Sequence, residues 1–266
     1  MIKNCSSIFA FLFLFMPILT SANILKIGAN TLNLDYVETK DDGTFLDSET
    51  TGWEDIGGVE LSYSLPMGDG NGGADESSLE ASLSYVKGVS DYNGFLQSNG
   101  TLLGSYKNDT DIEIIETEIR WVETKHTKDF DLSTFVSLGY RYWLRENSHD
   151  IYRIKEEYKW MYFNVGLKSL FHDENWHVGL EFAYQRAVNP SLFADIKGGL
   201  DFDLGTTDGY YYKIPLIYDI NDKYSIELSY KYDYWKIEKS NVVQGFYEPD
   251  SETKNKIVTL SLVMEF

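Results

Sequence analysis

The chain has 266 residues, with 42 acidic and 23 basic side chains and a formal net charge of −19. This excess of acid argues against nucleic acid as a partner, because nucleic-acid binding requires a basic surface. The chain is polar on average, with a mean hydropathy of −0.31, and aromatic residues make up 15% of it. Together with five prolines and one cysteine, this composition favours an all-β protein without disulfides.

Residues 1–22 have the pattern of a secretory signal peptide. Lys3 provides a short basic region, an apolar run covers residues 8–19, and small residues surround a cleavage point after Ala22. The alternative is an N-terminal membrane anchor, but this run is too short to span a bilayer as a helix. We therefore expect these residues to be removed, which leaves residues 23–266 as a single domain without cysteine.

The mature chain alternates apolar and polar residues with a period of two, which predicts β-strands. In the segment YSIELSYKYDYW, for example, tyrosine, isoleucine and leucine occupy one face and serine, glutamate, lysine and aspartate the other. The first strand is the least regular, because its apolar residues change phase between Ala29 and Leu32, and we attribute this to a β-bulge near Asn30. The sequence predicts ten strands: 24–38, 52–66, 78–91, 111–123, 130–145, 156–170, 175–187, 209–220, 223–238 and 256–266.

The connections between these strands alternate in character. Those after the even-numbered strands are short or rich in glycine, whereas most of those after the odd-numbered strands are longer and acidic. About ten antiparallel strands, with short periplasmic turns at one end and long outer loops at the other, are the pattern of a transmembrane β-barrel. The predicted fold class is therefore all-β, as one antiparallel barrel.

Alternation alone does not distinguish a soluble barrel, which buries its apolar face, from a membrane barrel, which turns that face to lipid. The distribution of aromatic residues favours the membrane, because they concentrate near the ends of the apolar faces, where they would form two interfacial girdles. The predicted girdle residues are Tyr63, Trp121, Tyr142, Tyr184, Tyr212, Tyr218, Tyr224, Tyr232, Tyr234 and Phe266.

The opposite face of the strands carries too many charges for a dry core. The predicted lumen charges are Glu116, Glu118, Arg120, Arg141, Arg145, Glu181, Glu227 and Lys231. We expect the three arginines to face inward and to pair with Glu116 or Glu118 across neighbouring strands. Such pairs favour a plugged, narrow barrel, and a selective pore for small solutes is the alternative.

The terminal segment IVTLSLVMEF resembles the C-terminal signal of Gram-negative outer-membrane barrels, with apolar residues at alternate positions and Phe266 last. The resemblance implies a location in the bacterial outer membrane and recognition of this strand by the barrel assembly machinery. It also implies contact with outer-membrane lipid and lipopolysaccharide. A ten-strand layout is similar to that of omptin proteases and of some outer-membrane adhesins.

The sequence lacks the Asp-x-His spacing that the omptin resemblance would require for catalysis. His149 with Asp150 is a candidate for a general base at the outer rim, and a solvated loop is the simpler interpretation. Asp69 and Asp75 lie in a glycine-rich turn without the spacing of a calcium loop. We expect no cofactor and no metal site, and the acidic outer loops either bind divalent cations or are only solvated.

These patterns favour a non-enzymatic protein with a structural or surface-interaction role through its acidic outer loops. A narrow porin-like channel for small solutes is the second hypothesis. An outer-membrane hydrolase or protease that uses His149 is the third.

Overall fold

The computed structural model describes residues 23–68, 75–98, 101–147 and 154–266. The described residues form a single antiparallel sheet of strands. Its strands are β1 (Ile24–Thr39), β2 (Phe45–Thr50), β3 (Ile56–Pro66), β4 (Asp75–Ser98), β5 (Thr101–His126), β6 (Phe130–Asn147), β7 (Ile154–Asp173), β8 (Trp176–Ala194), β9 (Leu200–Asp203), β10 (Thr207–Asn221), β11 (Tyr224–Ile237) and β12 (Asp250–Glu265). No helix in this part of the chain is long and apolar enough to cross a membrane.

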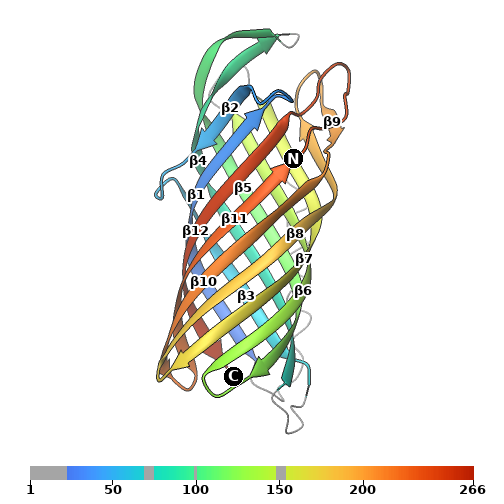
Figure 1. The fold of residues 1–266 in the computed structure, drawn as a ribbon. Coiled ribbons are helices and arrows are strands. Elements are labelled where there is room, and N and C mark those ends of the chain that lie inside the picture. The colour runs from blue at the N-terminus through green and yellow to red at the C-terminus, as the bar shows by residue number, and fades with distance from the viewer. Residues whose placement is uncertain (1–22, 69–74, 99–100, 148–153) are drawn as a thin grey trace.

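The sheet closes into a barrel, because β12 pairs with β1 along the whole of β1 (Figure 1). The prediction of about ten strands is confirmed as ten positions in the wall, although twelve strands are present. The short strand β2 and β3 share one position, since both pair with β1 and β4. Likewise β9 and β10 both pair with β8. The two extra strands therefore arise where a wall strand is interrupted.

The two ends of the barrel differ as the connection lengths predict. We call the end with the β5–β6, β7–β8 and β10–β11 connections the short-turn end; it lies at the bottom of Figure 1. At the other, outer end, much of the sequence expected as loop is strand. The β4–β5 ladder continues up to the pair Ser98 and Thr101 and projects as a hairpin beyond the rest of the wall.

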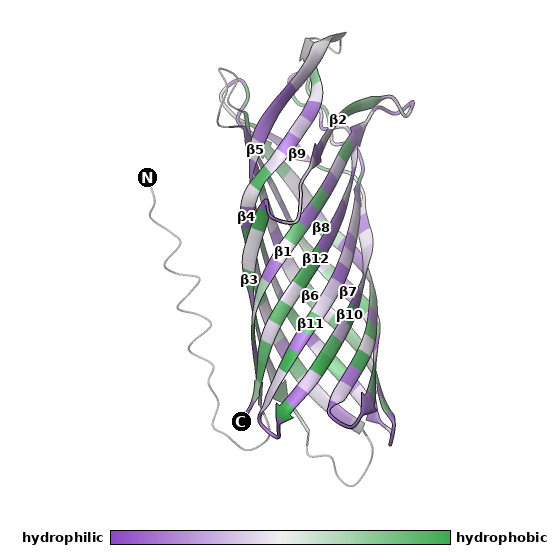
Figure 2. Ribbon diagram, turned by 90° about the vertical axis from the view of Figure 1, so that its left-hand side faces the viewer, coloured by the Kyte–Doolittle hydropathy of each residue, from purple (hydrophilic) through white to green (hydrophobic). Residues whose placement is uncertain are grey.

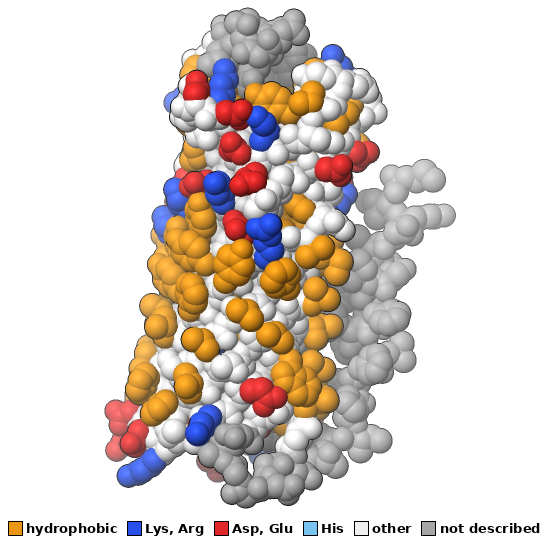
Figure 3. Space-filling model, turned by 45° about the vertical axis from the view of Figure 1, so that its right-hand side comes forward, with side chains coloured by type: hydrophobic (Ala, Val, Ile, Leu, Met, Phe, Trp, Pro, Cys, Tyr) orange, Lys and Arg blue, Asp and Glu red, His pale blue; other side chains and the backbone are white. Residues whose placement is uncertain are grey.

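The exterior of the half nearer the short-turn end is apolar. Side chains such as Val136, Leu138, Val165, Leu167 and Leu180 are each more than half exposed. Green apolar positions concentrate along this half in Figure 2, and Figure 3 shows a band of apolar side chains with charged ones above it. An exposed apolar surface of this extent requires a lipid environment.

The phase change in β1 has a different cause from the predicted bulge. Its register with β12 and with β3 is continuous through Asn30, so the prediction of a bulge there is wrong. Ile27 and Ala29 point outward and are exposed, whereas Leu32 and Leu34 point inward and are 2% and 1% exposed. The strand keeps its geometry, and the apolar residues change sides because the surroundings of the barrel change from lipid to water.

Above the apolar band the barrel has a buried core like that of a soluble protein. This interior cluster contains residues of several strands, among them Leu32, Ile112, Trp143, Trp160 and Trp235. In water, burial of such side chains contributes about 25 cal/mol per Å² of apolar surface removed from solvent. The outer half therefore gains stability from its interior, and the other half from lipid on its exterior.

Candidate functional site: the interior of the barrel

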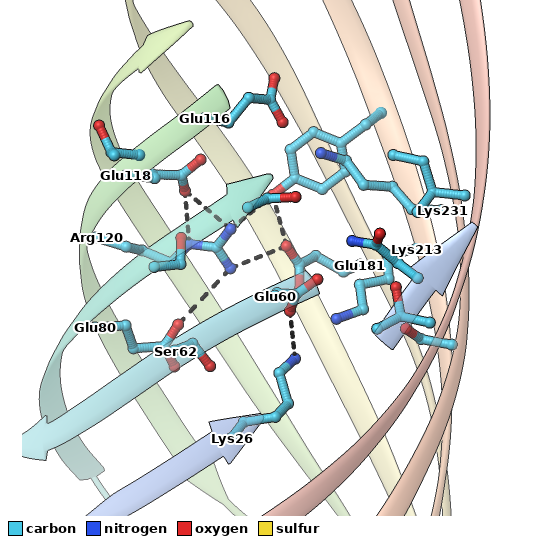
Figure 4. Close-up of a pocket in the computed structure, with 18 of the residues that line it drawn as sticks. Lys26, Glu60, Ser62, Glu80, Glu116, Glu118, Arg120, Glu181, Lys213 and Lys231 are labelled. Atoms are coloured by element: carbon cyan, nitrogen blue, oxygen red, sulfur yellow. Dashed lines mark hydrogen bonds and ion pairs between the residues drawn. The ribbon is translucent and has the colours of Figure 1, made fainter. Parts of the chain in front are cut away.

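Arg120 on β5 organises the lumen at the level of the apolar band (Figure 4). Its guanidinium lies 2.9 Å from a carboxylate oxygen of Glu181 and 3.0 Å from one of Glu118. Nη2 also donates to the hydroxyl of Tyr211 at 3.0 Å, and the guanidinium carbon lies 4.2 Å from the centre of the Phe135 ring. With Glu80 at 3.8 Å, Arg120 is thus held in place by three carboxylates, a hydroxyl and a ring.

Two lysines complete this charged layer from the opposite wall. Lys26 Nζ lies 3.0 Å from Glu60 and 3.3 Å from Glu227. Lys213 Nζ lies 3.0 Å from the same oxygen of Glu227. These groups line a cavity of about 140 Å³ that has room for several water molecules. Arg120, Lys26 and Lys213 each form an ion pair with at least one carboxylate, so the lumen here is polar and its charges are largely paired.

Arg141 forms the next layer toward the outer end and is 2% exposed. Its Nη1 donates to Glu116 at 2.7 Å and to Asp233 at 3.1 Å. The other oxygen of Asp233 accepts a hydrogen bond from Gln185 Nε2 at 2.7 Å. The guanidinium carbon lies 5.7 Å from the centre of the Trp160 ring. One cation therefore connects β5, β6 and β11 across the interior.

Arg145 lies in the aromatic and acidic part of the interior, above Arg141. Its guanidinium nitrogens lie 3.1 Å from Glu49 and 3.4 Å from Glu38. A third carboxylate, that of Glu156, lies at 3.0 Å. The guanidinium carbon stands 4.2 Å from the centre of the Tyr36 ring. Arg145 thus contacts carboxylates that come from three different strands.

Acid outnumbers base around Arg145. Asp47 faces Glu38 across the β1–β2 ladder, and Glu248 enters from the β11–β12 connection. Tyr158 donates its hydroxyl proton to Glu248 Oε1 at 2.5 Å. Glu248 lies outside the membrane-spanning band, and its burial, together with the charges of Glu38 and Glu156, raises its pKa well above the usual value. The raised pKa favours a neutral Glu248, which lowers the cost of burying it against Tyr36 and Tyr158.

Aromatic side chains fill the interior around these charges. Trp143 and Trp235 are completely inaccessible to solvent, and Trp160 is 2% exposed. The rings of Trp143 and Tyr158 stack with their centres 5.0 Å apart, and those of Trp160 and Trp235 lie 5.4 Å apart. Because these rings are packed away from solvent, they fill the part of the interior in which they lie.

The structure places all eight predicted lumen charges inside the barrel. Glu116 pairs with Arg141, and Glu118 pairs with Arg120, as the sequence predicted. Glu181 and Glu227 accept from cations, and Lys231 lies 4.6 Å from the centre of the Tyr211 ring.

The predicted partner of Arg145 is wrong. Its neighbour on β5 is Ile112, which lies above both Glu116 and Glu118, so its side chain reaches β1 and β2 instead.

The predicted girdle residues all lie on the exterior. Trp121, Tyr184, Tyr218, Tyr224 and Phe266 are exposed, and Tyr63, Tyr142, Tyr212, Tyr232 and Tyr234 are half-buried. On the outer side of the apolar band the tyrosines contact one another, with the Tyr212 and Tyr232 rings stacked 5.2 Å apart. Their position is compatible with an interfacial role, which stays a prediction.

The catalytic candidates His149 and Asp150 lie outside the described residues, as do Asp69 and the side chain of Asp75. Within the described ranges, no group of three or more His, Cys, Asp or Glu side chains is arranged to hold a metal ion.

The charged pairs of the outer half were not predicted from the sequence. Glu38 and Glu49 lie in segments that were expected at the edge of a strand or in a loop, so neither was assigned to the lumen. The signal was available in β1, where Leu32, Leu34 and Tyr36 share a face with Glu38. Because Glu38 continues this inward apolar face, the strand pattern indicates that its carboxylate also points into the interior.

The sequence matches no protein-family model and no curated protein sequence. The fold is similar to that of the outer membrane protease OmpT from Escherichia coli, with a TM-score of 0.63 and 11% identity over 94% of this chain and 99% of that chain. An outer membrane channel from Pseudomonas putida F1 has a TM-score of 0.47 and 8% identity, over 96% of this chain and 98% of the other. For Ail, the attachment invasion locus protein of Yersinia pestis, the TM-score is 0.36 and the identity 11%, over 93% and 100%.

The first of these similarities shows a shared fold, and its 11% identity supports no statement about catalysis. The other two TM-scores are too low to add to it. The chain therefore has the fold of bacterial outer-membrane β-barrels, and its apolar exterior fits it for that membrane.

Proposed function

We propose that this protein is a closed outer-membrane barrel that acts through its outer surface, in a structural or surface-interaction role. The observation that carries the proposal is the filled interior. The solvent-inaccessible Trp143 and Trp235, with Arg141 and Arg145 bonded to carboxylates on other strands, occupy the space that a channel would need. A barrel that is filled in this way leaves its outer surface as the place of contact with a partner.

The β4–β5 hairpin is the part of the outer surface best placed for such contact. Asp91 and Asp109 stand directly opposite each other on it, and both are exposed. Like charges in this position destabilise a hairpin by a few tenths of a kcal/mol to about 1 kcal/mol. A pair that weakens the fold and faces outward supports a role in attracting a partner with a basic surface.

Binding of a small basic protein to cells that display the barrel tests this proposal. We expect salt-sensitive binding that falls when Asp91 and Asp109 are both replaced by asparagine, while the folded barrel becomes slightly more stable. Asp195→Asn, at an exposed acid in the β8–β9 connection of the outer end, is the matched control and should leave binding unchanged. Binding that is absent, or equal in the double variant and the control, would contradict the proposal.

The proposal extends to the surroundings of the barrel. Phe266 is 59% exposed, and its backbone N–H donates to the carbonyl of Asn23 at 3.0 Å, so the last strand is fully paired with the first. This arrangement supports recognition of β12 by the barrel assembly machinery during insertion. Outer-membrane lipid and lipopolysaccharide would then surround the apolar band in a Gram-negative bacterium.

A narrow channel for small solutes is the second candidate, because the cavity of about 140 Å³ beside Arg120 is lined by charged and polar groups. The aromatic side chains above this cavity argue against continuous passage. Conductance across a planar bilayer distinguishes the two functions.

A further inference from the structure

Histidines and carboxylates form a connected chain inside the short-turn end of the barrel. His126 Nδ1 lies 2.8 Å from Asp131 Oδ1, and Asp131 Oδ2 lies 2.8 Å from His172 Nε2. His172 Nδ1 lies 2.9 Å from His177 Nδ1, and His177 Nε2 lies 2.7 Å from Asp219 Oδ2. These residues come from β5, β6, β7, β8 and β10, so the chain follows about half of the circumference of the mouth.

With Asp131 and Asp219 ionised, the hydrogen bonds define which tautomer each of the two adjacent histidines adopts when its ring is neutral. An ionised carboxylate only accepts, so Nε2 of His172 donates to Asp131, and Nε2 of His177 donates to Asp219. A neutral imidazole carries a single N–H. In the neutral form each Nδ1 therefore presents a lone pair, and the two nitrogens lie 2.9 Å apart, which is also the length of an N–H···N hydrogen bond when one ring carries a second proton.

Two lone pairs this close repel each other unless a proton or a metal ion lies between or beside them. We propose that His172 and His177 form a binding site for a divalent transition-metal ion at the short-turn mouth of the barrel. Metal-bound histidines almost always donate their second ring nitrogen to a carboxylate or carbonyl, and both histidines here do so. The oxygens that would support the ligands are therefore in place.

The separation of the two nitrogens fits a shared ion. Imidazole nitrogens bind such ions at about 2.0–2.1 Å, so two that coordinate one ion at a right angle lie about 2.9 Å apart. The observed distance is 2.9 Å. Right-angled coordination by nitrogen and oxygen is typical of Cu²⁺ and Ni²⁺, and Cu²⁺ binds tightest in the series of divalent ions.

The surroundings favour an exchangeable ion over a structural one. No third His, Cys, Asp or Glu side chain in the described ranges completes the set, so water would fill the other positions. The side chains of His172 and His177 are 31% and 15% exposed, which leaves a path for water and ions from the mouth. The carboxylates of Asp131 and Asp219 add negative charge that attracts a cation.

Titration of the refolded protein in detergent with Cu²⁺, followed by electron paramagnetic resonance and calorimetry, tests this site. We expect one ion per chain, with a spectrum that shows two coordinating nitrogens. His172→Ala and His177→Ala should each weaken binding at least tenfold, and Asp219→Asn should weaken it about 10- to 100-fold by releasing the ring of His177. Binding should also tighten as the pH rises, because the ion competes with protons for Nδ1.

The remaining histidines provide matched controls. His126→Ala removes a histidine that bonds to the same Asp131 but stands outside the pair, and His149→Ala removes the fourth histidine of the chain. Both variants should bind Cu²⁺ like the parent. If an alanine variant of the pair fails to refold, His→Gln at the same position replaces it. Absence of Cu²⁺ binding, or binding unchanged in both the His172 and the His177 variants, would overturn the proposed site. A proton shared between the two nitrogens would then explain their short distance.

Discussion

Replacement of Arg141 by methionine tests whether buried ion pairs hold the interior together. The guanidinium is 2% exposed and bonds to Glu116 at 2.7 Å and Asp233 at 3.1 Å. Methionine keeps much of the volume and the contact with the Trp160 ring but removes the charge. Both carboxylates then stay inside the barrel without their shared cation.

The expected loss follows from the burial of the partners. Removal of one member of a buried ion pair costs about 3–5 kcal/mol, mainly because the remaining charge is unpaired. The side chain of Asp233 is 2% exposed and that of Glu116 is 18% exposed, so Asp233 carries most of the penalty. Lys231, two residues from Asp233 on the same face of β11, compensates in part, which places the expected loss near 3 kcal/mol.

Urea unfolding in lipid vesicles, followed by tryptophan fluorescence, measures this loss. The double variant Arg141→Met/Asp233→Asn removes the unpaired charge and should recover about half of the lost stability. Lys87→Met is the matched control, because the Lys87 side chain is 62% exposed and its ion pair with Glu113 should contribute less than about 1 kcal/mol. A loss below about 1 kcal/mol for Arg141→Met, or no recovery in the double variant, would refute the reasoning.

Three further changes test other parts of the molecule. Gly209→Ala should destabilise the barrel by about 1–3 kcal/mol in the same assay, because a Cβ there would lie 2.0 Å from a backbone oxygen of β11. Gly104→Ala is its control, because a Cβ at that position would meet open space. Glu248 has a raised pKa, so its contribution to the packing of the β11–β12 connection is present at low pH and lost as the pH rises through that pKa. Hydrogen exchange of residues 238–249 should therefore be slower in Glu248→Gln than in the parent at pH 8, and equal at pH 4. His126 lies outside the membrane band. Partial burial lowers the pKa of its imidazole, but hydrogen bonds to two carboxylates raise that pKa overall. His126→Gln should therefore be less stable than the parent at pH 6 and equal to it at pH 9.

The wall of the barrel was predictable because the strand period survives in the sequence. β11 is an example: Ile226 and Leu228 are exposed to lipid, and Glu227 and Ser229 are buried in the lumen, as strict alternation requires. The pattern fixes the register, because a slip of one residue would turn the charges toward lipid.

The outer half was less predictable because the same alternation has the opposite meaning there. Leu34 and Tyr36 are apolar and inward, whereas Ile27 is apolar and outward on the same strand. Sequence reasoning that assigns all apolar residues to lipid must introduce a bulge to explain this change. If the level of the membrane boundary along β1 had been known, no bulge would have been needed to explain the pattern.

The interior contacts depend on closure of the barrel and were therefore partly hidden. The pair of Glu116 and Arg141 joins neighbouring strands and was found from the sequence. Arg145 pairs with Glu38 and Glu49 on strands about a hundred residues away, and local spacing gives no information about such distant partners.

Single-channel conductance of the refolded protein in a planar bilayer tests the central claim that the interior is closed. The claim predicts no discrete current steps from a preparation whose heat-modifiable mobility on a gel shows that the barrel is folded. It also predicts that a cavity opened by Trp235→Gly with Trp143→Gly would begin to conduct, because these solvent-inaccessible rings fill the interior. Discrete, salt-dependent steps from the parent protein, altered by neutralisation of Arg141, would contradict a closed barrel and identify a pore.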